Sequence, residues 1–573
     1  MSLFSVKVLV NSVLFFAVLA HSQAPKSVFD SKGMVASRSA IASEVGAKIL
    51  ASGGNAIDAA VSVGFALAVT YPSAGNLGGG GFMVIRLADG QVVANDHREK
   101  APGRATRDMY LDANGEIIDG LSTKSHLASG VPGTVAGLID VLEAYGSMEL
   151  VDVIQPAIDL ARDGFMLDED LAGQFKRRLE SFSKYPASLE VFSSDGEPYE
   201  TGDRFSQPDL AATLERIKLA GKKGFYAGET ADLIVAEMKN GGGIISLADL
   251  EDYESKWRKP IMGDYRGYKL VSMPPPSSGG VLLVQMLNML EPYDLGKLGV
   301  GSSEVIHLMI EAERRAYADR AEHLGDSDFY DVPIETLISK DYARERFLDF
   351  DPNKASVSTD IFAGVAAKEG LETTHASVID AMGNAVAYTT TLNLSYGSKI
   401  VVSGAGFLLN NEMDDFSAKE NSPNAFGLLG REANAIEPGK RMLSSMTPTI
   451  ILKNEKPLLV TGSPGGSTII TTVLQIVSNV IDHEMNLAEA VSAGRFHHQW
   501  QPDRVIYEKN AFSDVTRGEL IKMGHKNLNE VPAFYGGGIG DGNSVMSIDD
   551  GFLGMADPRN NGAAIGPSVL NEK

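Results

Sequence analysis

The chain has 573 residues, a formal net charge of −23, and 44% hydrophobic residues. This composition is ordinary for a globular protein, and the length allows about three or four domains or one large α/β unit. The acidic balance argues against a nucleic-acid partner, because phosphate binding needs clustered lysine and arginine. No cysteine is present, which excludes disulfides, thiolate metal sites and a cysteine nucleophile.

The N-terminus has the pattern of a secretory signal peptide. Lys7 precedes an apolar run over residues 8–20, and small and polar residues follow it. The run is about 13 residues long, whereas a membrane span needs about 20. We therefore expect residues 1–22 to be removed after Ser22, or less readily after Ala24, because Pro25 follows it. Export to a bacterial periplasm or the extracellular medium is the expectation, and a retained membrane anchor is the alternative.

The first half of the chain carries helical patterns and one strand hairpin. Residues 43–71 predict two helices separated by a Gly-Gly turn. Residues 76–96 predict a glycine-rich turn followed by two strands with Asp-Gly at the hairpin tip. Residues 130–260 show mostly helical patterns.

The middle of the chain adds further elements and a break. Residues 265–290 predict a strand, a proline stop and a helix that begins near Ser277 or Ser278. Residues 302–326 predict a long amphipathic helix. Residues 351–372 are polar and weakly periodic, which predicts an exposed linker.

Two further strand patterns follow the linker. Residues 373–393 alternate in polarity on both sides of a Met-Gly-Asn turn and predict a hairpin. Residues 459–477 predict a strand, a glycine-rich loop and a helix. Helical blocks on both sides of strand hairpins predict stacked α and β layers.

Most familiar catalytic motifs are absent from the sequence. The chain has no G-x-S-x-G nucleophile elbow and no H-E-x-x-H zinc motif. The glycines at 78–81 lead to Phe82 and not to the lysine of a phosphate loop. His497 and His498 are adjacent and would point to opposite sides of an extended chain, which disfavours chelation of a metal.

Thr373 is a candidate nucleophile that needs no cysteine, histidine base or metal. A threonine at a chain terminus can use its own α-amine as the base, because that amine has a pKa of about 7.7 to 8.0. An internal threonine has only a non-basic amide nitrogen. Thr373 therefore gains this chemistry only if the bond between Glu372 and Thr373 is cut. A threonine that merely opens a strand is the ordinary alternative.

Several motifs in order resemble the gamma-glutamyltranspeptidase family of N-terminal-nucleophile hydrolases. They run from about residue 27 to the C-terminus and read YPSAGNLGGGGF, DHREKAPGRATRDM, ERRAYADRAEHLGDSDF, TTHASVID, LLNNEMDDF, RMLSSMTPTI and TGSPGGSTIITTVLQ. Separate motifs in the right order are far more specific than one glycine-rich loop.

The resemblance implies a four-layer αββα sandwich made as an inactive precursor. Self-cleavage between Glu372 and Thr373 would give a large subunit, residues 23–372, and a small catalytic subunit, residues 373–573, which form a heterodimer within one compact unit. Thr373 would then attack the γ-glutamyl amide of glutathione or a related compound. The resulting ester would pass to water or to an amino acid or peptide. We expect neither a cofactor nor a metal.

The resemblance also assigns groups to the substrate α-carboxylate. Arg98 matches the arginine of the family that binds this group, and a planar guanidinium suits it bidentately. Ser444 and Ser445 match hydroxyls that bind the same carboxylate. Without the motif, a surface arginine paired with Glu99 would be as good an interpretation of Arg98.

The substrate α-ammonium is assigned to an acidic motif. Asp415 matches the residue that holds this group, and Glu412 and Asn393 match residues that assist it. The neighbouring Asp414 is expected to lie in a solvated turn.

The remaining assignments concern the nucleophile and the reacting carbonyl. Gly465 and Gly466 match oxyanion-hole glycines, whose N–H groups can converge on one oxygen because no Cβ obstructs them. Thr391 matches a residue that hydrogen-bonds the amine of the nucleophile. His375, two residues after Thr373 on one strand face, is expected to support the site and not to act as its base.

The sequence departs from the family pattern at three positions. Glu412 stands where some members have glutamine, and Ala376 stands where an aromatic residue is common. Phe426 replaces a tyrosine found in many bacterial members, so a lid over the pocket would lose a hydrogen bond to Asn393.

Two alternatives remain open at this point. A cephalosporin or glutaryl acylase would share the fold and the self-cleavage, but its substrates lack the α-ammonium for which Asp415 and Glu412 are suited. An exported solute-binding protein would fit the signal peptide and the acidity. It would neither cleave itself nor turn over glutathione.

Overall fold

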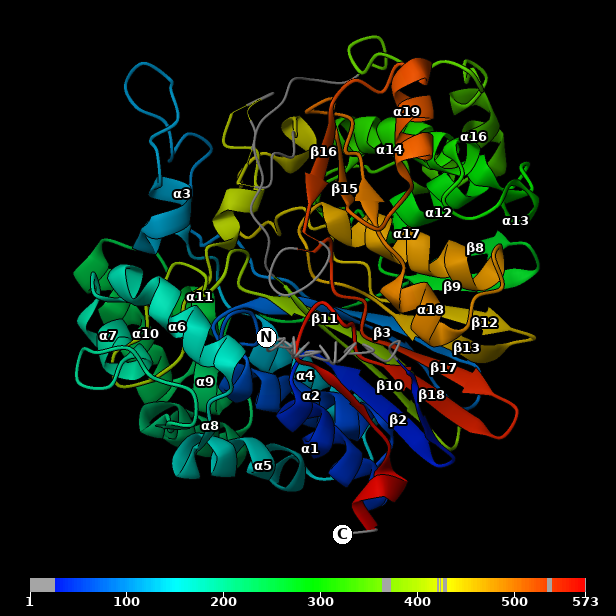
Figure 1. Cartoon of the computed structure of the whole chain (residues 1–573). Coiled ribbons are helices and arrows are strands. Elements are labelled where there is room, and N and C mark those ends of the chain that lie inside the picture. Colours follow the sequence, from blue (N-terminus) through cyan, green and yellow to red (C-terminus); the bar gives the residue numbers. More distant parts are fainter. Residues whose placement is uncertain are drawn as a thin grey trace, which may run out of the picture.

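Two seven-stranded antiparallel sheets form the centre of the protein in the computed structural model (Figure 1). The structure describes residues 26–362, 373–419, 422, 424–425, 430–532 and 538–571. The first sheet has the order β1 (Val28–Asp30), β18 (Gly551–Met555), β17 (Ser544–Ile548), β13 (Lys456–Thr461), β12 (Thr449–Lys453), β9 (Tyr268–Ser272) and β8 (Ile261–Tyr265). The second has the order β19 (Ala563–Ile565), β2 (Gly33–Ser37), β10 (Thr374–Asp380), β11 (Ala385–Thr391), β3 (Gly80–Arg86), β4 (Val92–His97) and β7 (Lys256–Arg258).

The facing sides of the two sheets enclose an apolar core. Ile379 and Phe82 of the second sheet pack in one cluster with Ile450, Val460 and Val545 of the first. Since successive strand residues point to opposite faces, the other face of each sheet must be covered by helices.

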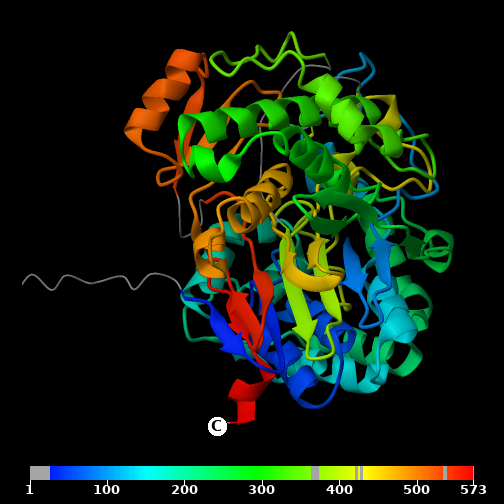
Figure 2. The same cartoon turned by 90° about the vertical axis from the view of Figure 1, so that its right-hand side faces the viewer.

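Helices cover both outer faces, as Figure 2 shows from the side. The second sheet packs against the layer that contains α1 (Ala40–Ala51), α2 (Ala56–Thr70), α4 (Thr134–Tyr145), α5 (Leu150–Asp163), α6 (Glu169–Phe182), α7 (Pro186–Phe192), α8 (Pro208–Ala220), α9 (Lys223–Tyr226), α10 (Gly228–Gly241) and α11 (Leu247–Glu251). The first packs against α12 (Gly279–Leu290), α13 (Leu295–Leu298), α14 (Ser303–His323), α15 (Ile334–Leu337), α16 (Lys340–Arg346), α17 (Thr468–Ile481), α18 (Leu487–Ser492) and α19 (Asp514–Met523). The αββα sandwich is therefore confirmed.

Shorter elements lie outside the four layers. They are α3 (Leu121–Lys124), β5 (Phe165–Met166), β6 (Arg204–Phe205), β14 (Phe496–His497), β15 (Val505–Glu508), β16 (Leu528–Val531), η1 (His126–Ala128), η2 (Glu412–Asp415), η3 (Glu432–Asn434) and η4 (Pro567–Asn571). Among the described helices, none combines the length and apolar character needed to cross a bilayer.

The hairpin predicted over residues 373–393 is the centre of the second sheet. Strands β10 and β11 pair with Thr374 opposite Thr390, and Gly383 turns the chain with a φ of 86°. His375 contacts Thr389 across the pair, at 2.8 Å between Nδ1 and Oγ1, on the face that looks toward the first sheet. Thr373 is two residues before His375, so its side chain points to the same face. Thr373 therefore lies at the start of the strand, at the margin between the two sheets.

The helical predictions for the N-terminal part are also confirmed. Helices α1 and α2 flank the Gly-Gly turn, and a capping box of Asn55 and Asp58 begins α2. Strands β3 and β4 form the predicted second hairpin, and α12 begins directly after Ser278 as expected.

The prediction of an amphipathic helix over residues 302–326 is wrong in one respect. Helix α14 exists, but its polar face is buried as well. Glu311 bonds Arg315 at 2.6 Å, and Arg314 bonds Asp503 at 2.6 Å, so ion pairs hold much of this buried face. The charged residues of this helix therefore mark positions that form ion pairs, and they do not mark a face exposed to water.

The predicted linker is only partly exposed where the structure describes it, over residues 351–362. Val357 and Phe362 are exposed, but Ser358 and Ile361 are buried. Trp500 Nε1 donates to the carbonyls of Ser358, at 2.9 Å, and Ile361, at 3.0 Å. The predicted signal peptide at 1–22, Ser22, Ala24, Glu372 and Phe426 lie outside the described residues.

Candidate active site

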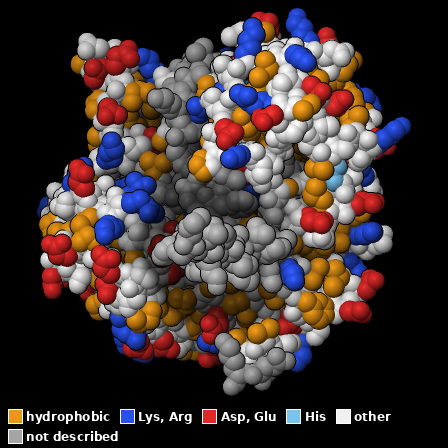
Figure 3. All heavy atoms as spheres, in the orientation of Figure 1, with side chains coloured by type: hydrophobic (Ala, Val, Ile, Leu, Met, Phe, Trp, Pro, Cys, Tyr) orange, Lys and Arg blue, Asp and Glu red, His pale blue; other side chains and the backbone are white. Residues whose placement is uncertain are grey.

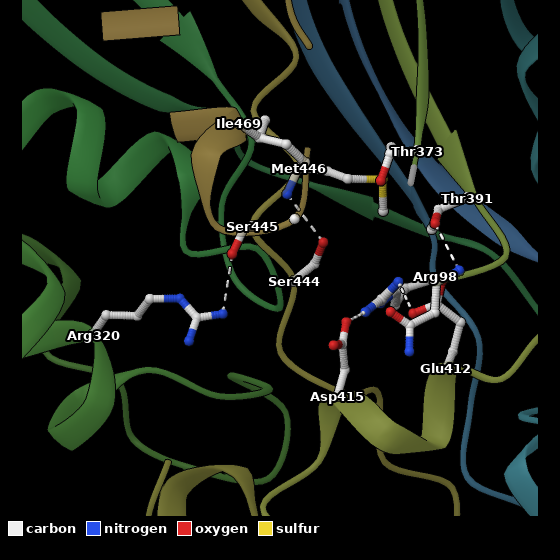
Figure 4. A pocket seen from close by; sticks show the side chains of 12 residues that line it. Arg98, Arg320, Thr373, Thr391, Glu412, Asp415, Ser444, Ser445, Met446 and Ile469 are labelled. Carbon is white, nitrogen blue, oxygen red and sulfur yellow. Dashed lines mark hydrogen bonds and ion pairs between the residues drawn. The ribbon is translucent and has the colours of Figure 1, made fainter. Parts of the chain in front are cut away.

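Nearly all residues assigned to a site by the sequence surround one small pocket (Figure 4). It is lined by Arg98, Arg320, Thr373, Thr391, Asn393, Glu412, Asp415, Ser444, Ser445, Met446, Gly466 and Ile469. Gly465, the remaining assigned residue of the described part, immediately precedes Gly466 in the same loop. The assembly joins segments far apart in the chain, because the ends of inner strands of both sheets meet there.

Several of the residues that line the pocket lie at the end of a strand or in a short helix. Thr373 precedes β10, and Thr391 ends β11 of the same hairpin. Arg98 follows the end of β4, while Glu412 and Asp415 are the first and last residues of the short helix η2. Strand ends and short helices hold side chains at fixed places without committing them to the core.

Arg98 and two carboxylates form a buried ionic cluster on one side of the pocket. Its Nη1 lies 2.6 Å from Glu412 Oε2, and its Nη2 lies 2.5 Å from Asp415 Oδ2. Glu99 also pairs with Arg98, at 3.5 Å, but the interpretation of Arg98 as a surface residue is wrong because the side chain is buried. Arg98 is 1% exposed and Asp415 is 11% exposed by side chain, so Asp415 is the member of this pair open to the pocket.

Burial controls the protonation of the acids in this cluster. Desolvation raises the pKa of Glu412 well above its ordinary value, raises the pKa of Asp415, and raises the pKa of Glu99 to about 7, although Arg98 opposes each shift. Arg98 is the cation that faces both of these buried acids, with Nη1 at 3.5 Å from Glu99 and 2.6 Å from Glu412. A cation entering the pocket would therefore be stabilised by these acids.

Asp414 does not lie in a solvated turn, as the sequence suggested. It is 7% exposed, accepts from Ser122 Oγ at 2.6 Å, and accepts from the Ala425 N–H at 2.8 Å. Burial raises its pKa to about 6. Asp414 thus points away from Arg98 and fixes neighbouring chain segments.

The two serines on the opposite wall are held by donors from the protein. The Met446 N–H donates to Ser444 Oγ at 3.1 Å, and Arg320 Nη2 donates to Ser445 Oγ at 3.2 Å. Arg320 belongs to α14 and is the one charged lining residue that sequence reasoning missed. It lies within the quoted ERRAYADRAEHLGDSDF motif, but nothing local separates it from the other arginines of that helix.

The glycine-rich loop approaches the pocket between β13 and α17. Gly465 has a φ of 134° and Gly466 a φ of 54°, and a Cβ on Gly465 would lie 2.3 Å from Thr468 Oγ1. Only glycine adopts these conformations without strain in this space. The loop therefore brings its backbone to the pocket that Thr373 lines at the start of β10.

The hairpin supplies the remaining polar groups. The Asn393 N–H donates to Thr391 Oγ1 at 2.7 Å, and Asn393 Nδ2 donates to the Asn411 carbonyl at 2.9 Å, with Asn393 at a φ of 75°. His375 bonds Thr389 and Ser377, and burial lowers its pKa to about 3. A neutral imidazole that makes two hydrogen bonds is consistent with a supporting role for His375.

One group among the described residues has the composition of a metal site, away from the pocket. His307, Glu311 and His525 place ligand atoms within 4.8 Å of one another. His307 Nδ1 and His525 Nε2 bond each other at 2.8 Å, and Glu311 bonds Arg315 and the Ser356 N–H. These donor atoms already have protein partners, so the group does not resemble an open metal site.

The fold and the site together define a class of enzyme. The solved cephalosporin acylase from Bacillus halodurans matches with a TM-score of 0.84 at 25% identity, covering 97% of this chain and 99% of the other. This chain shares with that structure the layered architecture of the N-terminal-nucleophile hydrolases. The structure therefore has this fold.

Sequence comparison gives the family within that class. The Gamma-glutamyltranspeptidase family model matches residues 42–567. The glutathione hydrolase proenzyme of Escherichia coli (strain K12) is 52% identical over 532 residues, covering 92% of this chain and 90% of that protein. The proenzyme of the same description from Pseudomonas sp. (strain A14) is 48% identical over 562 residues, covering 97% of each. The chain belongs to the gamma-glutamyltranspeptidase family.

Proposed function

We propose that this chain is a proenzyme that cleaves itself before Thr373 and then acts as a γ-glutamyltransferase and glutathione hydrolase. The observation that carries the proposal is the pocket beside Thr373, where two arginines, two carboxylates and the hydroxyls of Ser444 and Ser445 converge. A γ-glutamyl group ends in an α-carboxylate and an α-ammonium. A site with both charge signs a few ångströms apart suits such a zwitterion.

Maturation begins with Thr373 Oγ attacking the carbonyl carbon of Glu372. The peptide C–N bond breaks, an ester joins the two residues, and the former amide nitrogen becomes the α-amine of Thr373. Water then hydrolyses the ester, leaving a carboxylate on Glu372 and a free hydroxyl on Thr373. The products would be subunits of residues 23–372 and 373–573, held together by the interleaved strands of the second sheet.

Catalysis repeats the same chemistry on substrate. The α-amine of Thr373 takes the hydroxyl proton as Oγ attacks the γ-carbonyl carbon. The N–H groups of the Gly465–Gly466 loop stabilise the oxyanion, and Thr391 positions the nucleophile end of the hairpin. The leaving nitrogen takes a proton and departs, giving a γ-glutamyl ester. Water yields glutamate, and an amino acid or peptide amine yields a new γ-glutamyl amide.

Substrate binding would exchange partners within the ionic cluster. The α-ammonium takes Asp415, assisted by Glu412 and Asn393. The α-carboxylate takes Arg98 together with the hydroxyls of Ser444 and Ser445. Burial raises the pKa values of the acids around Arg98, and an incoming ammonium would favour their ionised forms.

This assignment distinguishes the proposal from the two alternatives. A glutaryl donor has no α-ammonium, so Asp415 and Glu412 would gain no cationic partner from it to offset their burial. Family membership favours an enzyme over a solute-binding protein. Export to a periplasm or the extracellular medium remains our proposal from the N-terminal segment.

The test is the intact mass and N-terminal sequence of each polypeptide in the purified protein. We expect two chains, one beginning at Thr373, and turnover of a γ-glutamyl anilide. Thr373→Ala should remain a single inactive chain, and Thr373→Ser should cleave itself slowly. A cleaved and active alanine variant would contradict the mechanism.

A further inference from the structure

Arg320 differs from the other buried arginines of its helix in having no acidic partner. Arg314 and Arg315 both bond Glu311. No carboxylate of the described residues lies within 4.0 Å of the Arg320 guanidinium nitrogens, although Arg320 is 4% exposed and lines the pocket of Thr373. Desolvation lowers its pKa to about 10, although the charge of Asp415 across the pocket opposes the shift, and Arg320 is still a cation at neutral pH. A buried cation with no acid bonded to it suggests that an anion completes the site.

The contacts of Arg320 fix the two serines of the pocket wall. Its Nε donates to Ser278 Oγ at 2.9 Å, and Ser278 Oγ donates in turn to the Ser444 carbonyl at 2.8 Å. Its Nη2 donates to Ser445 Oγ at 3.2 Å. Figure 4 shows the guanidinium reaching Ser445 from the side opposite Arg98.

The direction of these bonds determines where the serine protons can go. A guanidinium only donates, and a hydroxyl has a single proton. Ser445 Oγ therefore accepts from Arg320, and Ser444 Oγ accepts from the Met446 N–H. Neither hydroxyl donates to another described residue. Both protons are left for an acceptor inside the pocket, and a carboxylate offers two acceptor oxygens.

We infer that Arg320 is a positioning residue for the substrate α-carboxylate, holding Ser445 as a hydrogen-bond donor and supplying a second positive charge behind it. This inference rests on the proposed function and identifies a residue outside the assigned set. The charge balance supports it. Arg98 is already bonded to two acids, whereas Arg320 is the second cation that lines the pocket and has no bonded acid, so its charge is available to a carboxylate beside Ser445.

The experiment compares two inhibitors that differ by one group, L-glutamate and 4-aminobutanoate, which lacks the α-carboxylate. In the matured Arg320→Gln protein, we expect the inhibition constant of glutamate to rise about 30-fold, the effect of one charge-assisted hydrogen bond. The constant for 4-aminobutanoate should change by less than about 3-fold. Arg320→Lys should recover part of the loss, since a lysine can donate to Ser445 but cannot bridge to Ser278 as well.

Coupling to Ser445 separates positioning from general damage. If Arg320 acts through Ser445, the double variant Arg320→Gln/Ser445→Ala should raise the inhibition constant of glutamate by much less than the product of the two single-variant increases. Arg344→Gln, on an exposed arginine of α16, is the matched control and should leave both constants unchanged. An unchanged glutamate constant in Arg320→Gln, or equal weakening of both inhibitors, would overturn the inference.

If the Arg320→Gln protein does not fold, a second variant tests the same inference. Ser278→Ala removes the other anchor of Arg320 and should raise the glutamate constant about 3- to 5-fold, and no change there would also overturn the inference. Failure of the proposed function is distinct from all these outcomes, because the wild-type protein itself would then lack γ-glutamyl turnover.

Discussion

Replacing Asp415 by asparagine tests the proposal that this acid binds the α-ammonium of the substrate. The change keeps the shape of the side chain and leaves Arg98 paired with Glu412 at 2.6 Å, so the fold should survive. It removes the acid that is open to the pocket, which is 11% exposed whereas Glu412 is fully buried. The loss should fall on substrate binding more than on the chemical step.

The magnitude follows from the kind of contact that is lost. A hydrogen bond between charged partners contributes about 1.5 to 3 kcal/mol, which is about 10- to 150-fold in affinity. We therefore expect the KM of a γ-glutamyl anilide to rise by about 50-fold while kcat changes by less than about 5-fold. The glutaryl anilide, which lacks the α-ammonium, should not lose reactivity, so discrimination between the two anilides should collapse.

The neighbouring acid supplies a matched control. Asp414 is also buried, but it bonds Ser122 and Ala425 and not Arg98. Asp414→Asn should change KM by less than about 3-fold. The reasoning is refuted if Asp415→Asn keeps the wild-type KM, if both variants lose equally, or if the glutaryl anilide is affected as strongly as the γ-glutamyl anilide. Complete cleavage at Thr373 must be verified for each variant by intact mass.

Three further changes probe other parts of the molecule. Gly465→Ala should lower kcat about 100-fold by displacing the loop, whereas Gly439→Ala, at a φ of 77° with open space around it, should keep wild-type kcat and lose only about 1 kcal/mol of stability. His375 has a folded pKa of about 3, so below pH 6.5 the unfolded chain binds a proton that the folded protein does not, and stability falls as pH falls. The comparison is between a Thr373→Ala protein and the same protein with His375→Gln. The difference between their unfolding free energies should narrow by about 1.4 kcal/mol per pH unit as the pH falls from 6 to 4. A constant difference in denaturant titrations would contradict the lowered pKa of His375. Trp500→Phe should make residues 355–361 more susceptible to limited proteolysis and leave kcat of the matured protein within about 2-fold, and an unchanged digestion pattern would show that these hydrogen bonds do not anchor the segment.

The distribution of charge over the surface agrees with what composition implied. On the face shown in Figure 3, Lys and Arg side chains are interspersed with Asp and Glu. Mixed charge of this kind favours solubility, and it is unlike the clustered basic surface that a nucleic acid requires.

The sequence by itself determined those features whose cause is local. Alternating polarity on both sides of Gly383 specified the β10–β11 hairpin, because side chains on a strand point alternately to two faces. The Gly-Gly turn specified where α1 ends and α2 begins. The motifs placed Thr373, Arg98 and the glycine loop in one family, although no local pattern made Thr373 more than a residue at the start of a strand.

Only the tertiary structure decided which charged groups meet. Arg98 and Asp415 are 317 positions apart, and their contact arises because the ends of β4 and η2 reach the same margin of the two sheets. The same limit explains the errors over Asp414 and α14, where polar side chains that suggested solvent exposure found buried partners. Arg320 could not be separated from Arg314 or Arg315 by periodicity, since all three lie on one buried helix. Their roles differ only through what packs against them, and that depends on contacts between residues distant in the chain.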